Sequence, residues 1–187
     1  MTTQNTIINS PFRDLLIVDI GGTVASGYAG KLFADYGARV VNLEPSQGFS
    51  TRRIEPLLNN GNSAIHAYLH ANKESVCCDD LLTGHPAIAD ADLVLMDITT
   101  LPLSLSKDDF DVNVCAISWY GLNGPYADFN GSDASIYALT GLMQGVGESQ
   151  GPPIIPTGYQ PQIVGGLSAF NGAAGYLLGQ HLTGDDK

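Results

Sequence analysis

A glycine loop and a pair of arginines are the features of this sequence best suited to binding an anion. Residues 18–23 (VDIGGT) place two glycines after an apolar run and ahead of a helical segment, where backbone N–H groups favour anions. A complete GxGxxG motif is absent, so the dinucleotide fingerprint is weak. Arg52-Arg53 is the only pair of adjacent cations and the best local anion anchor, although a solvated loop explains the pair at least as well.

The same VDIGGT stretch also resembles the first phosphate loop of actin-like kinases, in which an Asp binds a metal and glycines let the backbone approach phosphate. That loop joins two antiparallel strands. Here a helical segment and then a second strand follow, which favours a parallel β-α-β unit. The kinase is therefore the least favoured of the functions considered.

The histidines and cysteines show no metal-binding or disulfide pattern. His66 and His70 are spaced to share one helix face, but no third ligand follows, so no metal site is predicted. Cys77, Cys78 and Cys115 are odd in number and two are adjacent, which is not a disulfide framework and indicates a reducing compartment.

Apolar runs and glycine stops predict the elements that position these residues. Residues 15–20 read as a buried strand, 27–36 as a helix and 39–43 as a second strand, which together predict a parallel sheet. The further predicted strands are 75–78, 92–98 and 112–119, and the further predicted helices are 64–70, 134–146 and 163–182.

The segment 163–182 is long enough to be considered as a membrane span. It holds Gly175 and Gly179 at GxxxG spacing. It also carries polar residues such as Asn171 and Gln180, and aromatic and basic anchors do not flank it. We therefore predict a buried or interface helix that exposes an apolar face containing Leu167, Phe170, Tyr176 and Leu177.

Composition narrows the class of protein. The 187 residues correspond to one domain or slightly more. The chain is 44% hydrophobic, which excludes a disordered chain, and only 14% charged, so part of its surface is predicted to be covered by another chain. The net charge of −11 argues against nucleic-acid binding. Residues 1–14 lack an apolar signal segment, and we predict a cytoplasmic protein without membrane attachment.

Four stretches resemble the family III CoA-transferases, which include formyl-CoA and carnitine CoA-transferases and alpha-methylacyl-CoA racemases. They are residues 15–44, 72–76 (NKESV), 117–127 (ISWYGLNGPYA) and 131–153, in the family's order and spacing. Family members are about twice as long, so the chain resembles an N-terminal portion. The resemblance implies an α/β fold with a Rossmann-like parallel sheet and flanking helices, incomplete without the family's C-terminal half.

The resemblance also implies a division of the chain and a partner. Residues 1–14 would form an N-terminal tail, 15–160 the Rossmann-like domain, and 161–187 a glycine-rich helix and the start of a linker. Because two chains of the family interlock like links, this chain is expected to form a homodimer or to join a heteromeric partner chain.

In such proteins CoA is a substrate that lies over the C-terminal ends of the strands. By position in the resemblance, the CoA-binding residues would be Val24, Ala25, Arg52, Arg53, Cys78, Asp79, Asp80, Asp97, Ile98 and Thr99. The expected ligands are acyl-CoA or a free carboxylic acid, with no metal.

Departures from the family pattern bear on activity. In the transferases one Asp, four residues before a glycine at the start of the last helix, becomes a mixed anhydride and then a thioester. Gln162, ahead of Gly166, occupies that place, and an amide is neither a carboxylate nucleophile nor a general base. Glu74 and Thr99 replace family cations, and Ser132 replaces the racemase His.

The sequence thus predicts a CoA-transferase family III protein, by resemblance transferring CoA between carboxylic acids, with impaired catalysis and weak or absent CoA binding. The alternative is a non-catalytic subunit or half-domain that completes an active CoA-transferase or racemase.

Overall fold

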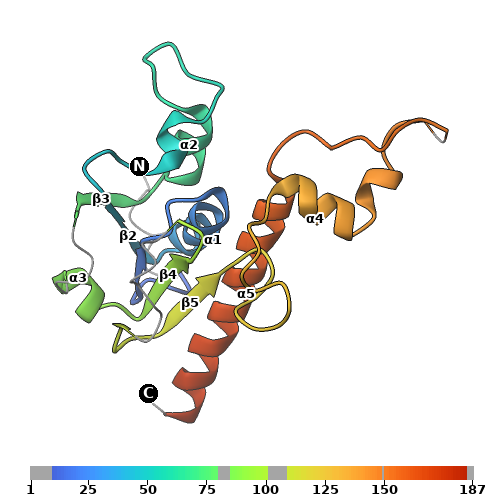
Figure 1. The fold of residues 1–187 in the computed structure, drawn as a ribbon. Helices are drawn as coiled ribbons and strands as arrows, with labels where there is room; N and C mark the ends of the chain where they lie inside the picture. Colours follow the sequence, from blue (N-terminus) through green and yellow to red (C-terminus); the bar gives the residue numbers. More distant parts are fainter. Residues whose placement is uncertain (1–9, 80–84, 101–108, 149, 185–187) are drawn as a thin grey trace.

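The computed structural model describes residues 10–79, 85–100, 109–148 and 150–184. Its centre is a five-stranded parallel sheet in the order β3-β2-β1-β4-β5 (Figure 1). The strands are β1 (Leu16–Asp19), β2 (Arg39–Glu44), β3 (Glu74–Cys77), β4 (Leu93–Asp97) and β5 (Val114–Ile117). The predicted α/β fold with a parallel sheet is confirmed, and the parallel β1–β2 pairing differs from the hairpin of an actin-like kinase.

Both faces of the central strands are buried, which explains why they read as continuous apolar runs. Ile17 and Leu95 belong to the core cluster on one face, and Val18 and Val94 to the cluster on the other. In the register of β1 and β4, Val18 lies beside Val94.

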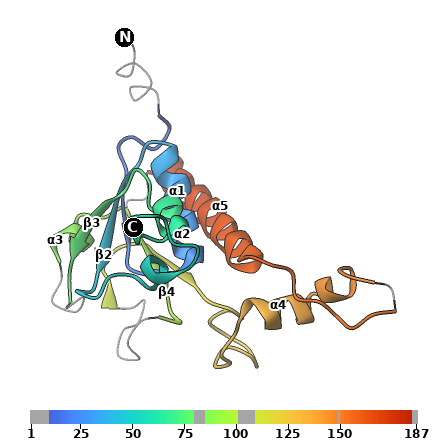
Figure 2. The same ribbon diagram turned by 90° about the horizontal axis from the view of Figure 1, so that it is seen from above.

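Helices α1 (Val24–Asp35) and α5 (Gln160–Thr183) pack against each other on the first face of the sheet (Figure 2). Phe33 of α1 and Phe170 of α5 meet edge to face, with ring centroids 4.8 Å apart. A Cβ atom at Gly166 would lie 2.4 Å from the carbonyl oxygen of Ala25, so glycine allows α5 to approach α1 at that point.

The predicted bounds of two helices differ from the bounds in the structure. Helix α1 begins three residues before the predicted start at 27, because Thr23 and Ser26 form a capping box. The predicted helix 134–146 is interrupted at Gly141, whose φ is 73°. It consists of α4 (Asp133–Leu139) and the short η4 (Leu142–Gln144), and this region projects away from the sheet (Figure 1).

Shorter helices complete the described chain: η2 (Ser50–Arg53), α2 (Ala64–Leu69) and α3 (Pro86–Ala89). Helix α3 was not predicted. It contributes Ile88 to the second core cluster, where Ala91 also packs.

The predicted exposed face of α5 is wrong in two of its four residues. Phe170 and Leu177 pack against the core cluster beneath α1, whereas Leu167 and Tyr176 are 42% and 51% exposed. The larger apolar side chains that α5 exposes also include Val164, Leu178 and Leu182. In the part of the chain that the structure describes, no helix is long and apolar enough to cross a membrane.

Candidate functional site

The loops that follow β1 and β4 form the centre of the site. From β1 the chain moves outward to β2 and β3 and then returns to β4 on the other side of β1. Loops that leave a parallel sheet in opposite directions open a crevice at the carboxyl ends of the strands. Two hydrogen bonds join them here: the Thr23 hydroxyl donates to the Asp97 carboxylate at 2.8 Å, and the Thr100 hydroxyl donates to the Gly21 carbonyl at 2.6 Å.

A cleft of about 540 Å³ lies on the β2 side of this crevice. We call it the Arg53 cleft. Its lining includes Gly21, Gly22, Gly48, Phe49, Arg53, Cys78, Asp79 and Thr100. Gly22 has a φ of 64°, and a Cβ atom there would lie 2.5 Å from the Phe49 ring, so the loop requires glycine. The Asp79 carboxylate accepts a hydrogen bond from the Ser46 amide at 2.6 Å.

The two adjacent arginines have different surroundings. Arg52 donates two hydrogen bonds, each 2.6 Å long, to the carboxylate of Glu44, whose side chain is 4% exposed. Arg53 donates to the Gln47 carbonyl at 2.9 Å and lines the cleft. Arg53 is therefore the cation that a ligand in the cleft would meet.

Glu44 is held in its ionised form. Burial opposes ionisation, but hydrogen bonds from Arg52, Ser75 and the Phe49 amide outweigh it and lower the pKa of Glu44 to about 2. The arrangement fixes the loop after β2 and commits Arg52 to a structural ion pair.

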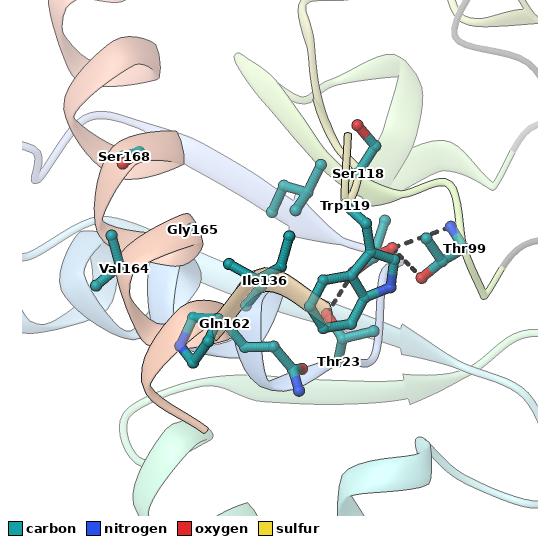
Figure 3. Close-up of a pocket in the computed structure, with 13 residues that line it drawn as sticks. Thr23, Thr99, Ser118, Trp119, Ile136, Gln162, Val164, Gly165 and Ser168 are labelled. Carbon is teal, nitrogen blue, oxygen red and sulfur yellow. Dashed lines mark hydrogen bonds between the residues drawn. The ribbon is translucent and has the colours of Figure 1, made fainter. Parts of the chain in front are cut away.

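A second hollow of about 240 Å³ lies between the loops after β1, β4 and β5 and the start of α5 (Figure 3). We call it the Trp119 cavity. Its lining includes Thr23, Ala25, Asp97, Thr99, Ser118, Trp119, Ile136, Gln162, Val164 and Ser168. The side chain of Gln162 extends toward Trp119 and Thr23 in Figure 3.

The amide of Gln162 has a fixed orientation. Its Nε2 donates a hydrogen bond of 2.8 Å to Oδ2 of Asp133 at the start of α4. The amide nitrogen therefore faces Asp133, and among the described residues the Gln162 carbonyl oxygen remains available as an acceptor. The other carboxylate oxygen of Asp133 is buried and has no hydrogen-bond partner among the described residues.

Asp97 is the carboxylate on the wall of the Trp119 cavity. It is 5% exposed and accepts hydrogen bonds from the Thr23 hydroxyl, the Thr99 hydroxyl and the Thr99 amide, the last at 3.0 Å. No lysine or arginine is among the described residues that line this cavity. Lys107 and Lys187 lie outside the described residues.

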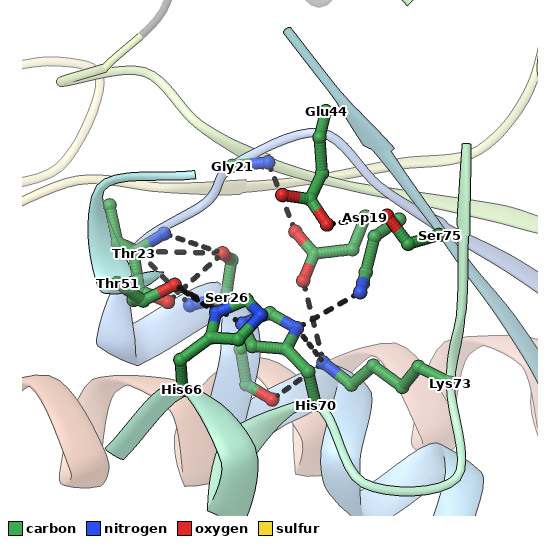
Figure 4. A network of polar contacts seen from close by, with 12 residues as sticks. Asp19, Gly21, Thr23, Ser26, Glu44, Thr51, His66, His70, Lys73 and Ser75 are labelled. Atoms are coloured by element: carbon green, nitrogen blue, oxygen red, sulfur yellow. Dashed lines mark hydrogen bonds and ion pairs between the residues drawn. The ribbon is translucent and has the colours of Figure 1, made fainter. Parts of the chain in front are cut away.

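A buried ion pair supports the loop between the two hollows (Figure 4). Lys73 Nζ lies 3.5 Å from Oδ2 of Asp19, and both side chains are fully buried. The other oxygen of Asp19 accepts from the Gly21 amide at 3.0 Å, and Lys73 donates to the Gly27 carbonyl at 2.8 Å. Burial lowers the pKa of Lys73, and the charge of Asp19 opposes that shift.

The predicted sharing of a helix face by two histidines is confirmed. The rings of His66 and His70 stack with centroids 4.3 Å apart. Asn42 donates to Nδ1 of His70 at 3.0 Å, and burial together with the charge of Lys73 lowers the pKa of His70 to about 2. His70 is therefore a neutral packing residue. Within the described ranges, no group of three or more His, Cys, Asp or Glu side chains could hold a metal ion.

The structure separates the predicted site residues into three groups. Ala25, Asp97, Thr99 and Gln162 line the Trp119 cavity, and Arg53, Cys78 and Asp79 line the Arg53 cleft. Val24, Arg52 and Ile98 are not among the residues that line either hollow: Val24 is 3% exposed, Arg52 is paired with Glu44, and Ile98 packs against the second core cluster. Asp80 lies outside the described residues.

Glu74, one of the predicted cation replacements, lies away from both hollows. It forms an exposed ion pair with Arg39 at 2.8 Å. Sequence reasoning also missed Trp119 and Asp133 as site residues. The single tryptophan and the carboxylate of the Gly131-Ser132-Asp133 motif were visible signals, but neither indicated a contact with the start of α5.

The fold and the family resemblance agree with the comparisons with known proteins. The sequence profile of CoA-transferase family III matches residues 12–85 and 102–187. The chain belongs to this family.

Relatives within the family are CoA-transferases. A succinate–glutarate CoA-transferase of Agrobacterium fabrum is 28% identical over 165 residues, which cover 77% of this chain and 41% of that protein. A succinyl-CoA:glutarate CoA-transferase of Mus musculus is 27% identical over 93% of this chain and 43% of its own length. The crystal structure of a CAIB/BAIF family protein from Brucella suis is 26% identical with a TM-score of 0.80, covering 94% of this chain and 51% of that one. The chain spans less than half the length of these two curated relatives.

Proposed function

We propose that this chain binds CoA and acyl-CoA across the Arg53 cleft and the Trp119 cavity without performing the covalent steps of CoA transfer. The observation that carries the proposal is the position of Gln162 in the first turn of α5. It lies four residues before Gly166, which packs against the Ala25 carbonyl, and it lines the Trp119 cavity. That is where the resemblance expects the carboxylate nucleophile. A neutral amide neither attacks a thioester as a carboxylate does nor accepts a proton at neutral pH.

Neither neighbouring carboxylate is placed as a substitute for the missing nucleophile. Asp97 is engaged by three hydrogen bonds from Thr23 and Thr99. Asp133 bonds the amide of Gln162 and is not among the residues that line the cavity. The described site therefore supports binding and orientation of a thioester rather than acyl transfer to the protein.

The Arg53 cleft is the better of the two hollows for the anionic end of CoA, although Arg53 is the one cation among its described lining residues. Arg53 and the backbone of the glycine loop supply hydrogen-bond donors there, whereas Arg52 is held by Glu44 and Lys73 by Asp19. A missing charge-assisted hydrogen bond costs about 1.5–3 kcal/mol. We therefore expect CoA to bind with a Kd on the order of 0.1–1 mM.

Thioester exchange tests the catalytic part of the proposal. The purified chain is incubated with acyl-CoA and a free acid, and the products are identified by mass spectrometry. We expect no exchange, because loss of a covalent relay removes several orders of magnitude of rate. Turnover at roughly 1–10³ per second, the ordinary range for enzymes, would overturn it.

Calorimetric titration tests the binding part. A Kd in the range above supports the proposal, whereas a low micromolar Kd would show that the argument from missing cations is wrong. No heat of binding at about 10 mM CoA would contradict the assignment of CoA itself. Arg53→Ala should weaken the binding of CoA, because Arg53 lines the cleft. Arg39→Gln is the matched control and should leave CoA binding unchanged, because it removes an exposed cation that pairs with Glu74 away from the cleft.

We also propose that a second chain, either a copy of this one or a heteromeric partner, covers the exposed surface of α4 and α5. Leu139 is 66% exposed, Val164 60%, Leu178 57% and Leu182 75%. Several large apolar side chains left exposed on two packed helices favour an interface. Sedimentation velocity at several concentrations is expected to show association. A single species near 19.7 kDa at high concentration, without binding of a hydrophobic dye, would contradict it.

A further inference from the structure

Asparagine followed directly by glycine occurs at four places in this chain, in the pairs 60–61, 123–124, 130–131 and 171–172. Glycine has no Cβ, so its amide nitrogen can approach the side-chain carbonyl carbon of the preceding asparagine more closely than that of any other residue. Attack of that nitrogen closes a five-membered ring and expels ammonia. The four pairs have different surroundings in the structure, and these decide where the reaction is possible.

Backbone hydrogen bonds restrain two of the pairs. The pair 171–172 lies inside the long helix α5, where the peptide has helical geometry and its amide donates along the helix. In the pair 60–61, the glycine amide donates to the Leu58 carbonyl at 2.8 Å, and the asparagine Oδ1 accepts from the Asn62 amide at 3.1 Å. The groups that must react are therefore already bonded to others in both pairs.

An aromatic ring restrains the third pair. A Cβ atom at Gly131 would lie 2.3 Å from Cγ of Trp119, so the backbone of this glycine packs directly against the indole. Asn130 is exposed, but the rotation that brings the Gly131 nitrogen to its side chain would disturb that packing. This pair is therefore expected to react more slowly than one in open space.

The fourth pair lies in open space, in the loop between β5 and α4 (Figure 1). Asn123 and Gly124 are both exposed, and no atom lies within 4 Å of a Cβ position at Gly124. Among the described residues, neither the side chain of Asn123 nor the amide of Gly124 has a hydrogen-bond partner. Both reacting groups are thus free, and the surrounding backbone can move without losing a contact.

We propose that Asn123 is a site of spontaneous modification to aspartate and isoaspartate in the folded chain. The Gly124 nitrogen attacks Cγ of Asn123 and gives up its proton as the side-chain nitrogen leaves as ammonia, so one C–N bond forms and one breaks. Water then opens the cyclic imide. Cleavage of the new bond to Cγ gives aspartate, and cleavage of the original peptide bond gives isoaspartate. Water is the only co-reactant.

The product changes the loop that carries Trp119. Either form adds a negative charge to a chain whose net charge is already −11. Isoaspartate also lengthens the backbone between β5 and α4 by one carbon atom. The inference goes beyond the proposed function and does not depend on it, because neither CoA nor an acyl group takes part.

Peptide mapping of the aged chain tests the proposal. The purified chain is kept in mildly alkaline buffer, and timed samples are cleaved with a protease that cuts before aspartate. Cuts before Asp111, Asp128 and Asp133 place Asn123 and Asn130 on separate peptides, which mass spectrometry resolves. The same protease also cuts before an aspartate newly formed at position 123 but not before isoaspartate, so the two products are distinguished.

We expect Asn123 to react first. Asn60 should react about two- to tenfold more slowly, because its hydrogen bonds must break before the ring closes. Asn171 should stay unchanged over the same period. Asn113 is an internal control on the same peptide as Asn123: a β-branched valine follows it, and its side chain donates to the Asp92 carbonyl and to Gln180. It should not react.

A variant and a denatured sample separate the effect of sequence from that of structure. Asn123→Gln should abolish the change in its peptide, because closure would need a six-membered ring, and should leave the rate at Asn60 as in the native chain. In concentrated urea all four pairs should react at similar rates, because the contacts that restrain three of them are lost.

Three results would overturn the proposal. The first is a native chain in which Asn60, Asn130 or Asn171 reacts as fast as Asn123 or faster. The second is an Asn123 that remains intact while the same pair reacts in urea. The third is an order of rates that is the same in buffer and in urea, since the folded surroundings would then not select the site.

Discussion

The Arg53 cleft and the Trp119 cavity share the loops after β1 and β4 but are built from different groups. The cleft presents glycine backbone and a guanidinium, whereas the cavity presents an indole, an amide carbonyl and a carboxylate. The carboxyl ends of β1 and β4 thus border two different hollows, because the chain leaves these two strands in opposite directions. Under the proposed function, the guanidinium and glycine backbone of the cleft would meet the anionic end of CoA, and the cavity would meet the thioester end.

Breaking the buried ion pair between Lys73 and Asp19, which supports the loop between the two hollows, should have the largest effect on stability. Lys73→Met leaves the fully buried Asp19 without its partner, and we expect a loss of about 3–5 kcal/mol in the free energy of unfolding. Urea unfolding measures it. The double variant Asp19→Asn with Lys73→Met should recover part of the loss. A single variant as stable as the native chain would show that the ion pair does not support this loop.

Changing the contact between α5 and α1 should affect the Trp119 cavity more than the cleft. In Gly166→Ala the new Cβ would meet the Ala25 carbonyl, and we expect a loss of about 1–3 kcal/mol in the free energy of unfolding with altered Trp119 fluorescence. Gly172→Ala on the same helix meets open space and should stabilise by about 0.5–1 kcal/mol. Equal effects of the two substitutions would contradict the tight helix contact.

Substituting each arginine in turn separates binding from stability within the cleft. Arg53→Ala should weaken CoA binding about tenfold and leave the free energy of unfolding nearly unchanged, because its side chain bonds only the Gln47 carbonyl in the described contacts. Arg52→Ala should instead lower that free energy by about 1.5–3 kcal/mol, since Glu44 loses its partner. Calorimetric titration and urea unfolding distinguish the two, and reversed roles would contradict the assignment.

The dependence of stability on pH gives the smallest expected effect. The pKa of His70 is lowered to about 2, below its value of about 6.5 in the unfolded chain, so the unfolded state takes up a proton first as the pH falls. Stability should therefore decrease below pH 6.5, by about 1 kcal/mol at pH 5.5. His70→Gln, which cannot titrate, should reduce the change in urea midpoint between pH 6.5 and 5.5, and the remaining change is expected from His66, whose pKa burial also lowers. An unchanged slope would contradict this account.

At lower pH a second group is expected to contribute in the same direction. Glu44 has a pKa of about 2 when folded and near 4.5 otherwise, so its stabilising contribution is complete above pH 4.5 and is lost as the pH falls toward 2. The Arg52→Ala variant should show less of this second decrease, because Arg52 donates two of the four hydrogen bonds that the Glu44 carboxylate accepts and carries the opposite charge.

The centre of the sheet was predictable from the sequence because the strands β1, β2 and β4 are buried and the first crossover is short. The features that the sequence did not predict depend on contacts between residues far apart in the chain or on the capping residues of one helix. Arg52 and Arg53 are adjacent residues of the same type, so the sequence alone does not tell which of them pairs with Glu44. In the structure it is Arg52. Phe170 and Leu177 resemble Leu167 and Tyr176 in sequence, and only the position of α1 decides which pair is buried.

Part of the candidate site was predicted by resemblance rather than by periodicity. Gln162 was recognised from its spacing to Gly166, and the structure places it beside a cavity. Its contact with Asp133 joins residues 29 positions apart and depends on how α4 turns back to α5. Helix α3 has four residues, too few to display a helical period, and was missed for that reason.

The order of the strands has a consequence for how the chain reaches this structure. Strand β1 comes first in the described part of the chain but occupies the centre of the sheet, and its neighbour β4 follows only after β2 and β3. Closing so long a loop is entropically costly, so the pairing of Ile17 with Leu93 is expected late in folding. Until then the β4 side of β1 stays open to pairing with other chains, and the yield of refolding should fall as protein concentration rises.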